Sequence, residues 1–223
     1  MAEKFPGNGS HLERYAAQLN AVEINSSFYR PHRRTTYERW AASVPAHFRF
    51  AIKLPRTITH ERRLADSDDL SEQFASEVAG LAGKRGPVLV QLPPSLIFDA
   101  AIADAFFSSI NSILGGAVVC EPRHRSWFEA TADDLFIARG IARVAADPAR
   151  TEQAEIPGGR SDLRYTRLHG SPRIYWSPYD DAAVARHAEA ARDASVESWT
   201  IYDNTASGAA TANAIEMRNL IDR

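Results

Sequence analysis

The chain has 223 residues, of which 44% are hydrophobic and 24% charged, and its formal net charge is -2. This composition is typical of a globular domain and excludes a disordered chain, while the net charge gives no overall attraction to nucleic acid. Because no apolar run approaches the roughly 20 residues of a spanning helix and no signal peptide is evident, we expect a cytoplasmic protein without membrane contact.

Short β-rich runs alternate with helix-length segments, which predicts a parallel sheet covered by helices. In chain order, the seven predicted strands are Ala21 to Tyr29, Phe48 to Pro55, Pro87 to Pro94, Ala117 to Arg123, Ala142 to Pro148, Leu163 to Gly170 and Ser198 to Asn204. No linker or repeat divides the chain, so we expect one domain over residues 1–223.

Helix starts are predicted at three capping-box pairs: Ser10 with Glu13, Thr35 with Glu38 and Thr131 with Asp134. The segment 99–114 has apolar residues at helical spacing, and the expected buried stripe is Ile102, Phe106, Ile110 and Ile113. The segment 149–162 is expected to be a loop because it contains proline and paired glycines.

The alternation of side chains distinguishes two sheet architectures. In the first strand Val22 and Ile24 point to one side and Glu23 to the other. One side of each strand suits covering helices, whereas the other begins small or apolar and becomes polar toward the carboxyl end. This gradient favours a TIM-type (β/α) barrel with a polar mouth over an open doubly wound sheet.

The barrel mouth is where we expect the functional site, since barrel enzymes place their sites there. The candidate catalytic residues are Glu121, Lys53, Asp147, His169 and Glu23. The candidate substrate-binding residues are Asn25, His60, Gln91, Arg123, His124, Trp127, Arg173, Asp203 and Asn204. The same reasoning places Arg167 in the mouth. The alternative is that these groups form a satisfied polar network that plugs the barrel.

The loops that follow the strands are rich in arginine, as in RPHRR at residues 30–34 and EPRHR at 121–125. Arginine presents a planar fork of donors to phosphate oxygens, so this rim predicts an anionic ligand. The alternative is a solvated rim paired with neighbouring helices. Trp127 and Trp176 are candidates for stacking on a sugar or a base.

No cofactor motif is present. The histidines of the proposed site, His60, His124 and His169, have no recognised metal-binding spacing, and Cys120 is the only cysteine. We therefore predict no metal or other cofactor, with Mg²⁺ held by carboxylates as an open alternative.

Several strings together resemble the YecE-like family, also called domain of unknown function 72, from about Phe5 to the end of the chain. They are VEINSSFYR, FRFAIKLPRTITHERRL, GPVLVQLPPS, CEPRHRSWF, RLHGSPRIYW and IYDNTASGAATAN. The resemblance implies a TIM-like barrel and maps the family's motif residues onto Glu23, Asn25, Ser26, Lys53, His60, Gln91, Glu121, Arg123, Trp127, Asp147, His169, Asp203 and Asn204. It also implies an additional first strand that has no counterpart here. Either the recorded start is too late, or the barrel has a gap that a neighbouring chain, as in a homodimer, or a rearranged N-terminus covers.

The leading hypothesis is an enzyme that acts on a small anionic substrate, phosphate-bearing and sugar-like. In it Glu121 is the acid–base, Lys53 and Arg123 bind the anion, and Asp147 or His169 carries a second proton. The first alternative is a nucleic-acid-processing phosphodiesterase similar to endonuclease-IV-type barrels, whose basic rim follows the backbone. The second is a non-catalytic ligand-binding protein.

Overall fold

The computed structural model describes residue 5, residues 7–193 and residues 195–222. The strands are β1 (Ala21–Ile24), β2 (Arg49–Lys53), β3 (Arg85–Gln91), β4 (Val118–Glu121), β5 (Ala142–Arg143), β6 (Ala145–Asp147), β7 (Gly158–Gly159), β8 (Leu163–Leu168) and β9 (Glu197–Tyr202). The α-helices are α1 (His11–Ala16), α2 (Ser26–Tyr29), α3 (Arg34–Ala42), α4 (Asp68–Val78), α5 (Ala100–Leu114), α6 (Ala130–Ala138), α7 (Asp181–Ala191) and α8 (Ala209–Ile221). The shorter helical turns are η2 (Thr57–Glu61), η3 (Ala79–Lys84), η4 (Arg125–Phe128) and η5 (Glu152–Glu155).

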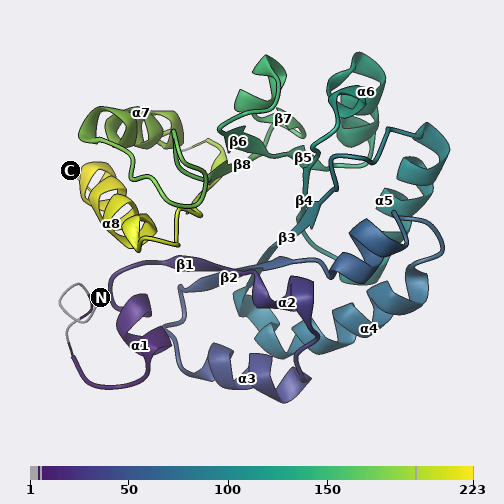
Figure 1. The fold of residues 1–223 in the computed structure, drawn as a ribbon. Helices are drawn as coiled ribbons and strands as arrows, with labels where there is room; N and C mark the ends of the chain where they lie inside the picture. The colour runs from purple at the N-terminus through teal and green to yellow at the C-terminus, as the bar shows by residue number, and fades with distance from the viewer. Residues whose placement is uncertain (1–4, 6, 194, 223) are drawn as a thin grey trace.

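The strands form two sheets, with the orders β1-β2-β3-β4-β5-β7 and β6-β8-β9. All neighbours are parallel except β5 and β7. Only Val144 separates β5 from β6, so the chain passes directly from one sheet into the other. Figure 1 shows the strands around a common centre with helices on the outside. This α/β fold is compatible with a TIM-type barrel, but the barrel is not closed.

The alternation expected from the sequence is confirmed. Ile24, Phe50 and Val90 belong to the apolar layer between the strands and the helices. A separate buried cluster holds residues of the opposite parity, and its members are Ala51, Leu89, Val119, Ala142, Val144, Leu163, Tyr165 and Trp199. Because these residues come from strands all along the two sheets, they fill the space that the strands enclose.

The predicted strands match the structure least at residues 21–29. The strand β1 ends at Ile24, Asn25 adopts a right-handed helical conformation, and α2 follows. The strand predicted at residues 142–148 is divided at Val144 into β5 and β6. The segment 149–162, predicted as a loop, contains the short elements η5 and β7.

One of the three capping boxes is confirmed, the pair Ser10 and Glu13 at the start of α1. The other two are wrong, because α3 and α6 begin two residues earlier than predicted and have no side-chain cap. Helix α5 confirms the segment 99–114, and Phe106 and Ile110 lie in its buried stripe. Ile102 does not, since it is 40% exposed.

The strands β1 and β9 each have one neighbour, and no pairing joins them in the part of the chain that the structure describes. A cavity of about 630 Å³ lies between them, lined by Val22, Trp199, Tyr15 and Met217 among others. Figure 1 shows β1 and α8 on opposite sides of this opening.

No helix among the described residues is long and apolar enough to cross a membrane.

Candidate functional site at the carboxyl ends of the strands

Arg167 on β8 lies at the centre of a buried ionic cluster, with its side chain 1% exposed. Its guanidinium nitrogens lie 2.8 Å from Glu23 Oε1, 2.6 Å from Glu121 Oε2 and 2.9 Å from Asp203 Oδ2. These carboxylates come from β1, from β4 and from the residue after β9, so one side chain joins opposite sides of the strand arrangement. Each charge is buried with a partner, which is the condition for burying charge without a large free-energy cost.

Two neutral side chains and Arg123 donate further hydrogen bonds to Glu23 and Glu121. The Tyr165 hydroxyl donates to Glu23 Oε2 at 2.7 Å, and Gln91 Nε2 donates to Glu121 Oε2 at 2.9 Å. Arg123 donates to Glu121 Oε1 from Nε at 3.1 Å and from Nη2 at 3.0 Å. Both oxygens of Glu121 therefore have donors.

The environment of Glu121 fixes its charge. Burial by itself raises the pKa of this carboxyl, but the neighbouring Arg167, His169 and Arg123 outweigh burial and hold the pKa well below its usual range. Glu121 is therefore ionised near neutral pH and is a poor proton donor.

His169 follows β8 and bridges two acidic groups. Its Nδ1 lies 3.2 Å from Asp203 Oδ2, and its Nε2 lies 3.7 Å from Glu121 Oε1, which is too long for a hydrogen bond. Burial lowers the pKa of His169, but the hydrogen bond to Asp203 and the charge of Glu121 outweigh burial and raise the pKa above its usual value. Nε2 is buried and has no hydrogen-bond partner among the described residues. A buried polar atom without a partner is uncommon in folded proteins, which makes this nitrogen a candidate for contact with a ligand.

We expect the imidazole of His169 to titrate above pH 6.5. Because the folded-state pKa is raised, the stability gained from the protonated ring is present below about pH 6.5 and lost as the pH rises through the folded pKa. NMR titration of the histidine ring signals measures this pKa, with His169→Asn used to assign the signal. A His169 pKa at or below 6.5 would contradict the expected dominance of Asp203 and Glu121.

Lys53 ends β2 on the inner side and is 7% exposed. No ion pair joins its Nζ to a carboxylate within the described ranges, and Nζ lies 4.1 Å from the centroid of the Phe28 ring. Burial, and next the charge of Arg167, lower the pKa of Lys53 to about 8. The cluster thus contains an amine that can lose its proton near physiological pH.

His60 lies on η2, in the loop that follows Lys53. Its ring centroid lies 5.0 Å from that of Phe28, edge to face, and its Nδ1 lies 2.8 Å from Thr59 Oγ1. Burial and then the charge of Lys53 lower the pKa of His60. The ring of Phe28 contacts both His60 and Lys53, so these three residues form one wall of the site.

Tyr165 and Tyr175 of this site were not among the predicted catalytic or substrate-binding residues. Tyr165 has inward parity two residues before Arg167, a signal that alternation would have given. Tyr175 lies in the loop after β8, which folds back so that its ring is 5.4 Å from the ring of His169. No pattern in the sequence indicates this contact, because an irregular loop brings the two rings together.

Asp147 lies outside the cluster. It ends β6 and pairs in register with Leu168, which packs against the outer helices. Its carboxylate accepts a hydrogen bond from the Tyr179 hydroxyl. The predicted place of Asp147 in the mouth is therefore wrong, because its side chain is on the opposite side of the strand from that of Arg167.

Three predicted substrate-binding residues make contacts that stabilise the fold. Trp127 is 1% exposed, donates from Nε1 to the Leu96 carbonyl at 2.9 Å and packs in the core, so stacking of Trp127 on a ligand is excluded. The His124 ring caps η4 by accepting from the Ser126 N–H. The Asn204 side-chain amide is buried and donates to the Ser177 carbonyl.

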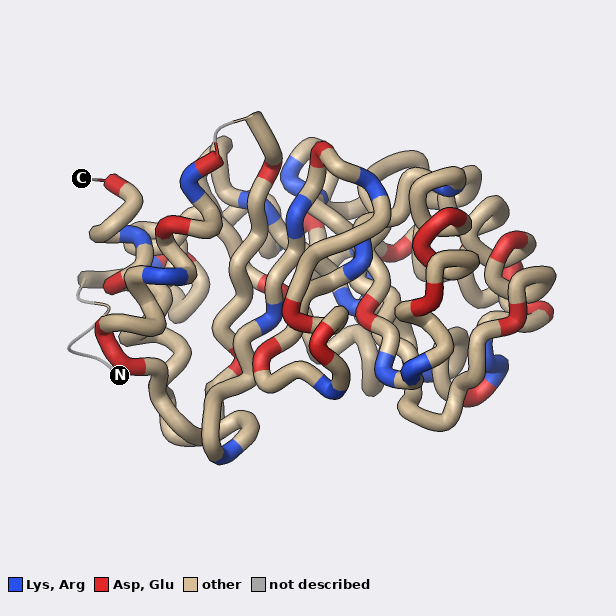
Figure 2. The backbone as a smooth tube through the Cα atoms, turned by 90° about the horizontal axis from the view of Figure 1, so that it is seen from above, with Lys and Arg blue, Asp and Glu red and all other residues tan. Residues whose placement is uncertain are grey.

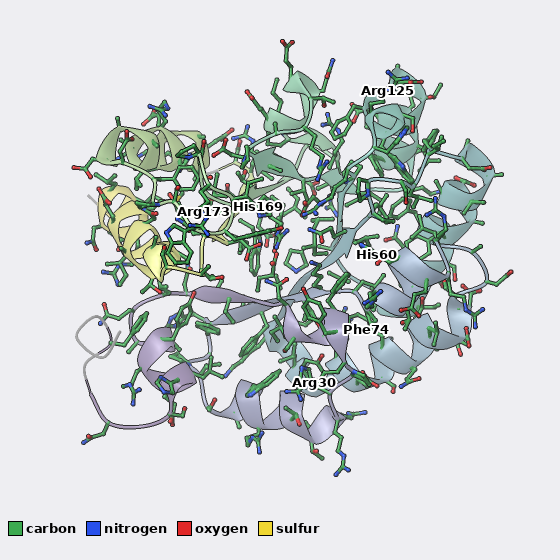
Figure 3. The ribbon with its side chains drawn as sticks, in the orientation of Figure 1. Arg30, His60, Phe74, Arg125, His169 and Arg173 are labelled. Carbon is green, nitrogen blue, oxygen red and sulfur yellow. The ribbon has the colours of Figure 1, made fainter. Side chains whose placement is uncertain are left out.

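The arginines of the expected basic rim do not form one positive surface. Arg34 pairs with Glu38 at 3.0 Å and Arg56 with Glu61 at 3.2 Å. In the view of Figure 2, basic and acidic residues are interspersed along the molecule. Figure 3 shows Arg125 beside α6 and Arg30 between α2 and α3, both away from His169 in this view. Much of the rim's positive charge is thus paired or distant from the cluster.

Two further candidates lie near the cluster without an ionic contact to it. Arg173 is exposed, its guanidinium carbon lies 4.5 Å from the Trp176 ring centroid, and Figure 3 places it beside His169. Asn25 follows β1, and its Oδ1 is buried without a hydrogen-bond partner among the described residues.

Within the described ranges, no group of three or more His, Cys, Asp or Glu side chains is arranged to hold a metal ion. The carboxylates that converge in the site have Arg167 at their centre instead.

A family model described as "Protein of unknown function DUF72" matches residues 3–223. The chain belongs to the DUF72 family. It is 32% identical to the protein YecE of Escherichia coli over 142 residues, which are 61% of this chain and 52% of YecE. It is 23% identical to the protein YunF of Bacillus subtilis over 95% of this chain and 86% of YunF. The matched region thus spans about half the length of YecE.

Solved structures of other DUF72 proteins have the same fold. One from Enterococcus faecalis has a TM-score of 0.83 at 20% identity, covering 100% of this chain and 92% of that one. One from Thermotoga maritima has a TM-score of 0.75 at 20% identity, covering 92% of this chain and 85% of that one. These similarities establish the fold of the DUF72 chain. Its chemistry has to be inferred from the geometry of the site.

Proposed function

We propose that this DUF72 protein is an enzyme that acts on a small anionic, phosphate-bearing and sugar-like molecule at the mouth of an open TIM-type barrel within one domain. The observation that carries this proposal is the buried Lys53, which has no carboxylate partner among the described residues. Arg167 and Arg123 occupy the nearby carboxylates. A ligand anion would supply the negative charge that the positive groups lack.

The side chains suit different roles in this site. Arg123 is 22% exposed and presents donors on a planar fork that suits phosphate. His169 is the proton carrier, since its Nε2 has no hydrogen-bond partner among the described residues and its pKa is raised. Glu121, predicted as the acid–base, is better suited to positioning Arg123 and Gln91, because its low pKa keeps it ionised.

Replacing Arg123 with glutamine is expected to raise the dissociation constant for inorganic phosphate at least tenfold, because a charge-assisted bidentate contact is lost. Arg125→Gln is the matched control, since Arg125 lies two residues further along and away from His169 in the view of Figure 3. Isothermal titration calorimetry measures both constants. Equal affinities in Arg123→Gln and the unmodified protein would remove Arg123 from the anion site.

Two other functions stay open as alternatives. A nucleic-acid phosphodiesterase loses one of its predicted stacking residues because Trp127 is buried, whereas Trp176 is 45% exposed. A ligand-binding protein without turnover would use the same positive groups. The homodimer expected to cover the open side also stays a prediction, supported by the unpaired edges of β1 and β9.

A further inference from the structure

We infer that Lys53 is a covalent nucleophile, and that its amine condenses with the carbonyl carbon of a small phosphorylated aldehyde or ketone to form an imine. This inference rests on the proposed function, because it names the substrate class and the reacting atom of the same site.

The residue type at position 53 is the first observation. The chain has 26 lysines and arginines, of which only Lys4, Lys53 and Lys84 are lysines. Arginine stays charged in proteins, whereas a lysine amine can lose its proton when buried. Anion binding alone is served by arginine, as elsewhere in this cluster. A lysine at this position provides what arginine cannot, an amine with a lone pair.

The surroundings of the two described lysines differ sharply. Lys84 donates hydrogen bonds to the backbone carbonyls of Ala41 and Val44 at the end of α3. Lys53 makes no hydrogen bond or ion pair through Nζ in the part of the chain that the structure describes, and it lies over the face of Phe28. Its nitrogen is therefore available to a ligand.

The charge state of Lys53 suits this role. The pKa of about 8 leaves about half of the amine neutral at pH 8, against roughly 0.4% for a lysine with an ordinary pKa. Burial lowers this pKa most. Of the charged groups that face the amine, Arg167 and Arg123 lower the pKa further, and Glu121 and Glu23 raise it. A lysine desolvated next to other cations is a recognised way to activate an amine.

The reaction balances without an oxidant or reductant. Nζ attacks the carbonyl carbon, the carbonyl oxygen takes a proton from the imidazolium of His169, and the proton released from nitrogen returns to the ring. In the second step His169 protonates the new hydroxyl, which leaves as water while the nitrogen lone pair forms the C=N bond. Loss of the remaining N–H proton restores the imidazolium and leaves a neutral imine. The face of Phe28 stabilises the cationic iminium form.

Borohydride reduction tests this inference, since it converts an imine into a stable secondary amine. The whole protein is incubated with dihydroxyacetone phosphate, glyceraldehyde 3-phosphate or ribose 5-phosphate, reduced, digested and analysed by peptide mass spectrometry. We expect at least tenfold more adduct on Lys53 than on Lys84. The rate should pass through a maximum with pH, because the reaction needs both the neutral amine of Lys53, whose pKa is about 8, and the protonated imidazole of His169. Inorganic phosphate should compete.

Two variants separate specific from random modification. Lys53→Arg should abolish the adduct while its circular dichroism spectrum stays unchanged, and Lys84→Arg should retain it. Equal labelling of the lysines, or no labelling of Lys53 by any of the three compounds, overturns the inference. Phosphate binding without an adduct leaves the proposed anionic site standing and removes the imine, whereas the absence of both removes the proposed function as well.

Discussion

Replacing Arg167 with methionine is expected to lower the free energy of unfolding by about 3–5 kcal/mol near neutral pH. The substitution keeps an unbranched side chain of similar length but leaves Glu23, Glu121 and Asp203 without their shared cation. Glu23 and Glu121 are 1% and 3% exposed, so water cannot replace the guanidinium. Urea denaturation followed by circular dichroism measures the change.

Arg164→Met is the matched control for this substitution. Arg164 lies on the same strand, but its pair with Asp193 is on the surface, where the two side chains are 36% and 44% exposed. We expect its loss to change stability by at most about 1 kcal/mol. A similar small effect for Arg167→Met would show that the buried cluster does not depend on its cation.

The pH dependence of the Arg167→Met effect has a definite sign. The folded-state pKa of Glu121 is held well below its usual range, so its contribution to stability is present above the unfolded-state pKa and lost as the pH falls through the folded-state value. Arg167 is the main cause of that lowering. The difference between the two proteins should therefore be full at pH 7 and shrink below about pH 4, where carboxylates become protonated in the unfolded chain.

Trp127→Ala is expected to destabilise the protein by about 3–5 kcal/mol, whereas Trp176→Ala should change stability by less than about 0.5 kcal/mol. Trp127 is 1% exposed and stacks on Phe136 at a centroid distance of 5.9 Å. Its removal leaves a cavity in the core and an unpaired Leu96 carbonyl. Trp176 is 45% exposed, so its truncation leaves no buried void.

Thermal and urea unfolding of both tryptophan variants measure these differences. The pair also distinguishes a core role from a ligand contact. If Trp176 contacts the ligand, Trp176→Ala should lower affinity without lowering stability. Near-native stability of Trp127→Ala would contradict the core position of this ring.

Side-chain alternation along the strands predicts the positions of two residues that the structure places outside the ionic cluster. With Ala142 and Val144 facing the interior, Asp147 has the parity of the outer side, and the structure places it there beside Tyr179. Asn204 likewise has the opposite parity to Asp203 and is buried beneath the loop after β8. Both were predicted at the mouth because they lie at the carboxyl ends of strands. Whether a side chain there points into the mouth depends on its parity along the strand.

The sequence alone determined the α/β class, the approximate positions of most strands and the inward direction of Lys53, Glu121 and Arg167. These follow from side-chain period and local composition, which are properties of neighbouring residues. Family membership was also evident from the sequence, because its strings are specific.

Only the tertiary structure decided which charges are paired. Glu23 and Arg167 are 144 positions apart and meet because strands from opposite sides of the fold enclose one space. The same arrangement gives Arg167 three carboxylate partners, whereas Lys53 has none among the described residues. A residue's sequence neighbours fix the direction of its side chain, but its partners and its desolvation depend on distant segments, and these two determine its pKa and its chemistry.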